Sequence, residues 1–269
     1  MKATGPRIQN QAAEPVGLPR SVASAPDCQT AFQKIARSCV NLIRHHGKQP
    51  ASADPEAVHS MRIELTRLRA AVLFFVPMTD DDAWPQINEE LQWLNSALGK
   101  ARNHDVTARY AGQKRYRRWA KSSQRAMQRA QRKVDRRLNK KLASHRYARL
   151  IATVDHWIAD GPWLQSGRSI RSEHVDAHAQ ARLQAWRQAI SREGRHVRLS
   201  HRKQLHRLRI RCKRYRYVVA ALQGLGVTIA TQELKFTEIA KRVHAALGDL
   251  RDLNGPRSCC GERRDGFSL

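Results

Sequence analysis

VHSMRIELTRLRAAVLFF at residues 58–75 and LHRLRIRCKRYRYVVAAL at 205–222 are the two stretches that decide the fold class of this chain. At 100° per residue, the apolar side chains of each stretch fall on one stripe, which a helix turns toward a protein core. The stripes consist of Val58, Met61, Leu65, Leu68 and Val72, and of Leu205, Leu208, Cys212, Tyr215 and Val219. Both stretches therefore predict amphipathic helices.

The rest of the sequence also favours helices. The ranges 86–161 and 163–255 contain no proline and are rich in Ala, Arg, Leu, Gln and Lys, all of which have high helix propensity. β-Branched and aromatic residues are too sparse for strands. We therefore expect an all-α protein. The expected helices are 28–46, 55–76, 83–99, 102–142, 146–159, 169–193, 199–224 and 231–248, several of them ending at a glycine: Gly47, Gly99, Gly161, Gly194, Gly224 and Gly248.

The two stretches also match each other, which indicates an internal repeat. His59, Arg62, Arg67 and Arg69 recur as His206, Arg209, Arg214 and Arg216, and A-L-G-x-x-R recurs at 97–102 and 246–251. Two matched blocks in the same order suggest duplicated helical halves. The expected organisation is a disordered segment 1–27, a first bundle half 28–142, a second half 143–255 and an irregular tail 256–269.

A basic arc borders each apolar stripe. The first arc holds His59, Arg62, Thr66 and Arg69, and the second holds Arg202, His206, Arg209, Lys213 and Arg216. The whole chain has 50 Lys and Arg against 23 Asp and Glu, a formal charge of +27, and the segment 195–216 has no acid at all. Because cations beside a core repel one another strongly at low dielectric, these arcs call for an anionic partner.

The motifs H-x-x-R-x-x-x-x-R-x-R, H-x-x-R-x-x-x-K-R-x-R-Y and L-G-x-x-R resemble those of the CHAD domain, the conserved histidine α-helical domain. The resemblance covers about residues 28–255. It implies two pseudo-twofold related antiparallel helical bundles with a basic central groove that binds inorganic polyphosphate. The residues carried over by match are His59, Arg62, Arg67, Arg69, Arg102, His206, Arg209, Lys213, Arg214, Arg216 and Arg251, and Arg202 joins them from the second arc.

The sequence departs from the family pattern at three places. Thr66 stands where the family usually has a second basic residue, and Asn103 stands where it usually has an acid. The family also continues with a long helix after the second L-G motif, whereas a short irregular segment follows Asn254 here. Whether the second bundle is complete is therefore left open, as is completion by a partner chain in an oligomer.

Catalytic chemistry finds little support in the sequence. H-E-x-x-H, G-x-S-x-G and glycine-rich phosphate loops are all missing, and the five cysteines have no C-x-x-C spacing. His174 and His178 have the i,i+4 spacing of metal ligands, with Glu173 and Asp176 nearby, but the sequence positions no further ligand. We therefore expect a binding protein without enzymatic activity, metal or cofactor.

Two other partners remain as alternatives to polyphosphate. A basic stripe also binds RNA or DNA backbones, although aromatic platforms for base stacking are few. The basic segment 102–142 also suits docking on an anionic granule or membrane surface, but it has no continuous apolar stripe for membrane insertion. The expected location is the cytoplasm, including polyphosphate granules, with nucleic acid as a competitor.

Overall fold

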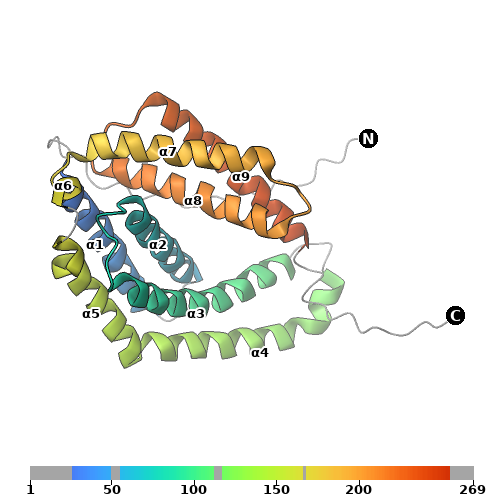
Figure 1. Cartoon of the computed structure of the whole chain (residues 1–269). Helices are drawn as coiled ribbons and strands as arrows, with labels where there is room; N and C mark the ends of the chain where they lie inside the picture. Colours follow the sequence, from blue (N-terminus) through green and yellow to red (C-terminus); the bar gives the residue numbers. More distant parts are fainter. Residues whose placement is uncertain (1–25, 50–54, 112–116, 166–167, 255–269) are drawn as a thin grey trace. The chain divides into compact units, whose positions relative to one another are not determined.

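The computed structural model describes residues 26–49, 55–111, 117–165 and 168–254. The expected all-α class is confirmed, since these ranges form helices and contain no strand (Figure 1). The helices are α1 (Cys28–Gly47), α2 (Pro55–Phe74), α3 (Trp84–Ala111), α4 (Arg117–Leu142), α5 (His145–Asp160), the 3₁₀ turn η2 (Pro162–Leu164), α6 (Arg168–Arg171), α7 (Val175–His196), α8 (Arg202–Gly224) and α9 (Thr231–Asn254). No helix within the described ranges is long and apolar enough to cross a membrane.

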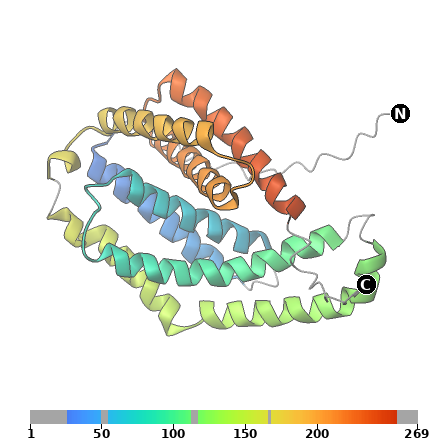
Figure 2. The same ribbon diagram turned by 45° about the vertical axis from the view of Figure 1, so that its right-hand side comes forward.

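The helices belong to two compact units. Pro26–His178 form the first, here called the N-terminal unit, and the described residues 179–254 form the C-terminal unit. Figures 1 and 2 show α1 beside α2 in the N-terminal unit and α8 beside α9 in the C-terminal unit. The first turn of α7 belongs to the N-terminal unit, and the rest of that helix belongs to the C-terminal unit.

Aromatic side chains fill the core of the N-terminal unit. The Phe32 ring of α1 makes edge contacts with Phe75, Trp157 and Trp163, at centroid distances of 5.1–5.8 Å. Burying each such side chain stabilises the fold by about 1.5–3 kcal/mol. Asp81 connects this core to α3, because its carboxylate accepts hydrogen bonds from Trp157 Nε1 at 2.8 Å and from the Trp84 backbone at the start of α3.

Helix α5 packs within the N-terminal unit. Its Tyr147 hydroxyl donates to the Ile43 carbonyl of α1, and Gln33 of α1 donates to the Ile158 carbonyl. An Arg44–Asp155 ion pair joins the same two helices. The sequence repeat placed the boundary between halves at 142/143, whereas the compact units divide at 178/179, because the apolar face of α5 packs on α1.

A buried carboxylate ties the three helices of the C-terminal unit together. Glu233 of α9 forms an ion pair with Arg187 Nε of α7 at 2.9 Å and accepts a 2.5 Å hydrogen bond from the Tyr215 hydroxyl of α8. Burial and the neighbouring Glu233 raise the pKa of Tyr215, which therefore stays protonated as a donor. The connection fixes how α7, α8 and α9 pack.

Most helix ends agree with the sequence expectations, but three glycines do not end a helix. Gly161 does follow α5, where a Cβ atom would collide with the Trp157 carbonyl oxygen. By contrast, Gly99, Gly194 and Gly248 lie inside α3, α7 and α9. The predicted irregular tail and all but the last two residues of the predicted disordered segment fall outside the described residues, and Asp27 in that segment caps α1.

Candidate functional site

The basic arc on α2 borders the core of the N-terminal unit as the sequence predicts. The predicted core stripe from Val58 to Val72 is buried throughout. Beside it, His59, Arg62 and Arg69, here called the α2 basic face, are half-buried. Thr66 does not take part as a cation, and its hydroxyl donates to the Arg62 carbonyl at 2.9 Å.

Arg69 is the most informative member of the α2 basic face. Burial lowers the pKa of its guanidinium, and no neighbouring carboxylate contributes to that shift. Among the described residues, no hydrogen bond or ion pair of this guanidinium is found. Because desolvation of a cation is unfavourable without a partner, an anion bound at Arg69 gains more than one bound at an exposed arginine.

Arg102 shows the same condition on α3, which packs against α2. Its Nη1 atom is buried and has no hydrogen-bond partner among the described residues. A buried donor without an acceptor costs about 1–3 kcal/mol, which an incoming phosphate oxygen would recover. The A-L-G-x-x-R block thus supplies a guanidinium with unused hydrogen-bonding capacity.

Arg67 has a different environment from the other predicted residues of α2. Its guanidinium forms a 2.7 Å ion pair with Glu64, which is buried inside the N-terminal unit. In helical register Arg67 lies about 140° from Arg62, away from the α2 basic face. Its charge is therefore already balanced within the fold.

The second arc lies on α8 in the C-terminal unit. Leu208, Cys212, Tyr215 and Val219 are buried as predicted, whereas Leu205 is only partly buried. The α8 basic face beside this stripe consists of the exposed Arg202 and His206 and the half-buried Arg209, Lys213 and Arg216. The Lys213 ammonium lies 5.3 Å from the Tyr217 ring centre, a cation–π contact.

The glycine of the second L-G-x-x-R block lies against the α8 basic face. A Cβ atom on Gly248 of α9 would lie 3.8 Å from Arg209 Nε and 3.9 Å from Arg209 Nη2. The missing side chain therefore leaves room for the Arg209 guanidinium along α9. Arg251, one turn further along, also belongs to α9, but its side chain lies outside the described residues.

Arg214, the repeat equivalent of Arg67, is half-buried and in register lies on the other side of α8 from Arg209. The structure therefore groups the twelve predicted residues by unit and by helix. It places three on the α2 basic face and five on the α8 basic face, sets Arg67 and Arg214 apart from both, and leaves Arg102 on α3 and Arg251 on α9.

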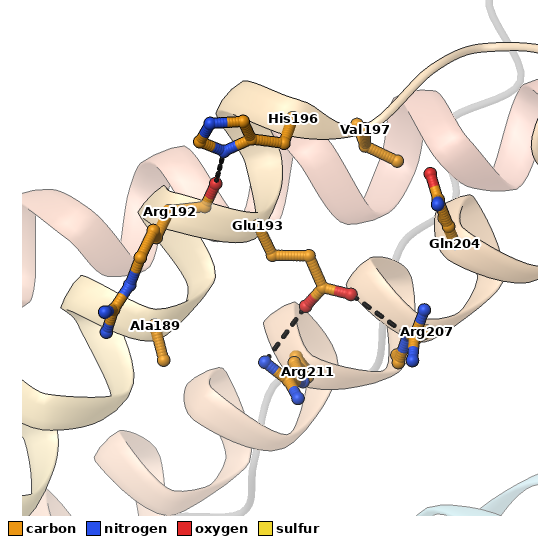
Figure 3. Close-up of a pocket in the computed structure, with 8 residues that line it drawn as sticks. All are labelled: Ala189, Arg192, Glu193, His196, Val197, Gln204, Arg207 and Arg211. Carbon is orange, nitrogen blue, oxygen red and sulfur yellow. Dashed lines mark hydrogen bonds and ion pairs between the residues drawn. The ribbon is translucent and has the colours of Figure 1, made fainter.

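A pocket of about 430 Å³ between α7 and α8 was missed by sequence reasoning. Figure 3 shows Glu193 of α7 between Arg207 and Arg211 of α8, with ion-pair distances of 3.2 and 3.0 Å. Its lining shares no residue with the α8 basic face, since Arg207 and Arg211 point to another side of the helix. Because the Glu193 carboxylate already pairs with two arginines of this pocket, the pocket is a weaker anion site than Arg69 and Arg102, which have no carboxylate partner among the described residues.

These features define an all-helical protein with basic faces that border its apolar cores. The family model of the CHAD domain matches residues 34–259, and the chain therefore belongs to the CHAD domain family. The resemblance inferred from the motifs is thus confirmed.

A solved structure supports the same fold. The crystal structure of the CHAD domain from the plant Ricinus communis is similar, with a TM-score of 0.71 and 20% sequence identity over 86% of this chain and 76% of that chain. A comparison with curated proteins finds no match.

Proposed function

We propose that this protein binds inorganic polyphosphate through the α2 and α8 basic faces and catalyses no reaction of its own. The observation that carries the proposal is the pair of guanidiniums on Arg69 and Arg102. Both are partly buried, and neither has a carboxylate partner among the described residues. Membership of the CHAD domain family, whose motifs imply polyphosphate binding, supports the same ligand.

The chemistry of the basic faces suits a polymer that offers only phosphate oxygens. Arginine presents a planar, permanently charged fork that binds two such oxygens at once. His59 and His206 stand in register with the arginines and add a hydrogen-bond donor near neutral pH. Because the α2 and α8 basic faces carry equivalent residues, successive phosphates of a linear polymer meet similar donors on each face.

A nucleic-acid backbone is the second candidate ligand, and one observation weighs against it. Binding of single strands usually adds stacking of bases on exposed aromatic rings. Of the two tyrosines in the basic stretch of α8, Tyr215 is fully buried and hydrogen-bonded to Glu233, and Tyr217 is half-buried beside the Lys213 ammonium.

In the cell, we further propose that the protein retains polyphosphate in the cytoplasm and on polyphosphate granules.

A competition experiment tests the ligand. Purified protein is bound to labelled long-chain polyphosphate at about 0.15 M salt, where loose surface attraction is largely screened. Unlabelled tRNA or duplex DNA is then added at matched phosphate concentration and in excess. Retention of polyphosphate supports the proposal, whereas displacement at matched phosphate concentration favours the nucleic-acid alternative.

A matched pair of variants tests the site. Arg69→Gln with Arg216→Gln removes one half-buried guanidinium from each basic face, at repeat-equivalent positions. Arg132→Gln with Arg137→Gln removes the same charge from exposed positions on α4. We expect at least a tenfold loss of polyphosphate affinity in the first double variant and less than threefold in the second. Equal losses would leave only bulk charge as the cause of binding.

A further inference from the structure

The start of α1 meets the segment that leads into α7 through three backbone contacts. The Cys28 amide donates to the Glu173 carbonyl at 2.9 Å, and the Val175 amide donates to the Pro26 carbonyl at 3.1 Å. A bridge between Asp27 and His174 completes the junction. All these residues belong to the N-terminal unit, and the junction joins segments almost 150 residues apart in sequence.

The junction brings a thiol, a carboxylate and an imidazole together. Ligand atoms of Cys28, Glu173 and His178 all lie within 4.8 Å of one another. Cys28 and His178 are buried, and Glu173 is partly exposed at the edge of the cluster. This is the one such group of metal-ligating side chains found within the described ranges.

The surroundings of His178 fix which nitrogen faces the cluster. Its ring stacks on Phe75 with an interplanar angle of 5°, and its Nε2 lies 3.3 Å from the Phe74 carbonyl oxygen. A carbonyl only accepts hydrogen bonds, so Nε2 carries the proton of the neutral ring and Nδ1 carries the lone pair. Nδ1 lies 4.0 Å from Glu173 Oε2.

In the neutral ring the Nδ1 lone pair faces the cluster, so a metal cation placed there would bind both Nδ1 and the Glu173 carboxylate. Histidines that bind metals commonly donate their second ring N–H to a backbone carbonyl, as His178 does to Phe74. A thiolate, an imidazole nitrogen and a carboxylate together form a ligand set that suits zinc better than magnesium or calcium. We propose that Cys28, Glu173 and His178 bind a zinc ion, with water in the fourth position.

The geometry requires only a small adjustment. A tetrahedral zinc ion holds its ligand atoms about 3.5 Å apart, so separations within the cluster must contract by about 1.3 Å at most. Glu173 provides this freedom, because its side chain is long and partly exposed. Burial, Glu173 and Asp27 raise the pKa of Cys28 to about 12, so the thiol is protonated when no zinc is bound. Its proton passes to solvent as the zinc–sulfur bond forms.

The i,i+4 histidine pair noted in the sequence is not the site. His174 turns toward Asp176, with its Nδ1 3.0 Å from the carboxylate oxygen. Sequence reasoning set the pair aside for lack of a further ligand. The fold brings Cys28, which lies at the other end of the N-terminal unit in sequence, next to His178 and so supplies that ligand.

Cobalt(II) titration of the full chain tests the site, because thiolate ligation produces a charge-transfer band in the near ultraviolet. The parent protein carries Cys259→Ser and Cys260→Ser, which leaves only the three buried cysteines. We expect the band to saturate at one cobalt per chain and zinc to abolish it. Cys28→Ser should remove the band, whereas Cys212→Ser, which changes a buried thiol outside the cluster, should retain it.

Glu173→Gln provides a second variant, because a partly exposed side chain tolerates this change without unfolding. We expect at least a tenfold weaker zinc affinity, and loss of the rise in Tm that zinc gives the parent protein. Zinc retained per chain after gel filtration is measured in parallel. Absence of a stoichiometric cobalt band in the parent, or an unchanged band and zinc affinity in both Cys28→Ser and Glu173→Gln, would overturn the proposal.

Discussion

Glu64 explains why Arg67 has a different environment from the other basic residues of α2. It is a buried acid beside a basic helix face, and burial raises the pKa of its carboxyl above the usual value of 4.5. The Arg67 guanidinium and the Cys39 thiol oppose that shift by bonding to the carboxylate. Arg67 therefore compensates an internal charge, although its place in the motif suggested ligand binding.

The raised pKa of Glu64 predicts a pH-dependent stability difference. The folded state holds this proton more tightly than the unfolded state, so the contribution is fully present below pH 4.5 and is lost as pH rises through the folded pKa. Glu64→Gln does not titrate. We expect the free energy of unfolding of the wild type, minus that of Glu64→Gln, to fall between pH 4 and 7 in urea titrations. A constant or rising difference would contradict this.

Arg67→Ala should act on stability more than on binding. Removing the guanidinium leaves the buried Glu64 carboxylate without its ion-pair partner, which costs about 1–3 kcal/mol. We expect this loss in chemical denaturation, with polyphosphate affinity of the folded protein changed less than twofold. Arg69→Gln is the matched comparison and should show the reverse pattern. If Arg67→Ala loses as much affinity as Arg69→Gln, its guanidinium contacts the ligand.

At the scale of the element, α9 shows why a glycine can be kept inside a helix. An interior glycine costs about 1 kcal/mol relative to alanine, which is why Gly248 was expected to end the helix. The helix instead continues to Asn254, and the Arg209 side chain of α8 lies along the surface that Gly248 leaves open. Packing between helices therefore outweighs the local propensity.

Substitutions at Gly248 separate helix stability from the position of Arg209. Gly248→Ala places a methyl group at ordinary contact distance from Arg209, so we expect about 0.5–1 kcal/mol of added stability with affinity retained. Gly248→Leu should displace the guanidinium and lower polyphosphate affinity at least fivefold. Gly194→Leu in α7 is the control, because nothing lies within 4 Å of its added Cβ. Equal affinity losses in both leucine variants would contradict the inference that Gly248 leaves room for the Arg209 guanidinium.

The success of sequence reasoning differs between periodic and non-periodic features. The apolar stripe and the α2 basic face follow from a 3.6-residue period, so both could be predicted from one helix alone. Glycine positions were ambiguous, since the same residue ends α5 at Gly161 and lies within α9 at Gly248. The sequence pointed to His178 only through its i,i+4 spacing from His174, and it gave no signal for Cys28, because the fold alone brings residues so far apart together.

At the scale of the whole molecule, the net charge of +27 includes cations that differ in their exposure to solvent. In 179–254 Lys and Arg outnumber Asp and Glu by seventeen to five, and two of those acids, Glu193 and Glu233, are already engaged by arginines. On the described part of α4 every cation except Lys141 is exposed, whereas those of the two basic faces are largely half-buried. Exposed charges are screened by salt much more than half-buried ones.

Salt dependence should therefore distinguish the two kinds of charge. For duplex DNA the logarithm of affinity falls with the logarithm of salt concentration by about 0.9 for each phosphate neutralised. We expect Arg132→Gln with Arg137→Gln to lower that slope for DNA and to leave polyphosphate affinity nearly unchanged at about 0.5 M salt, where exposed charges are screened within about 4–5 Å. Arg69→Gln with Arg216→Gln should weaken polyphosphate binding at every salt concentration. If both double variants change both ligands alike, the protein acts through total charge, and the half-buried guanidiniums confer no selectivity.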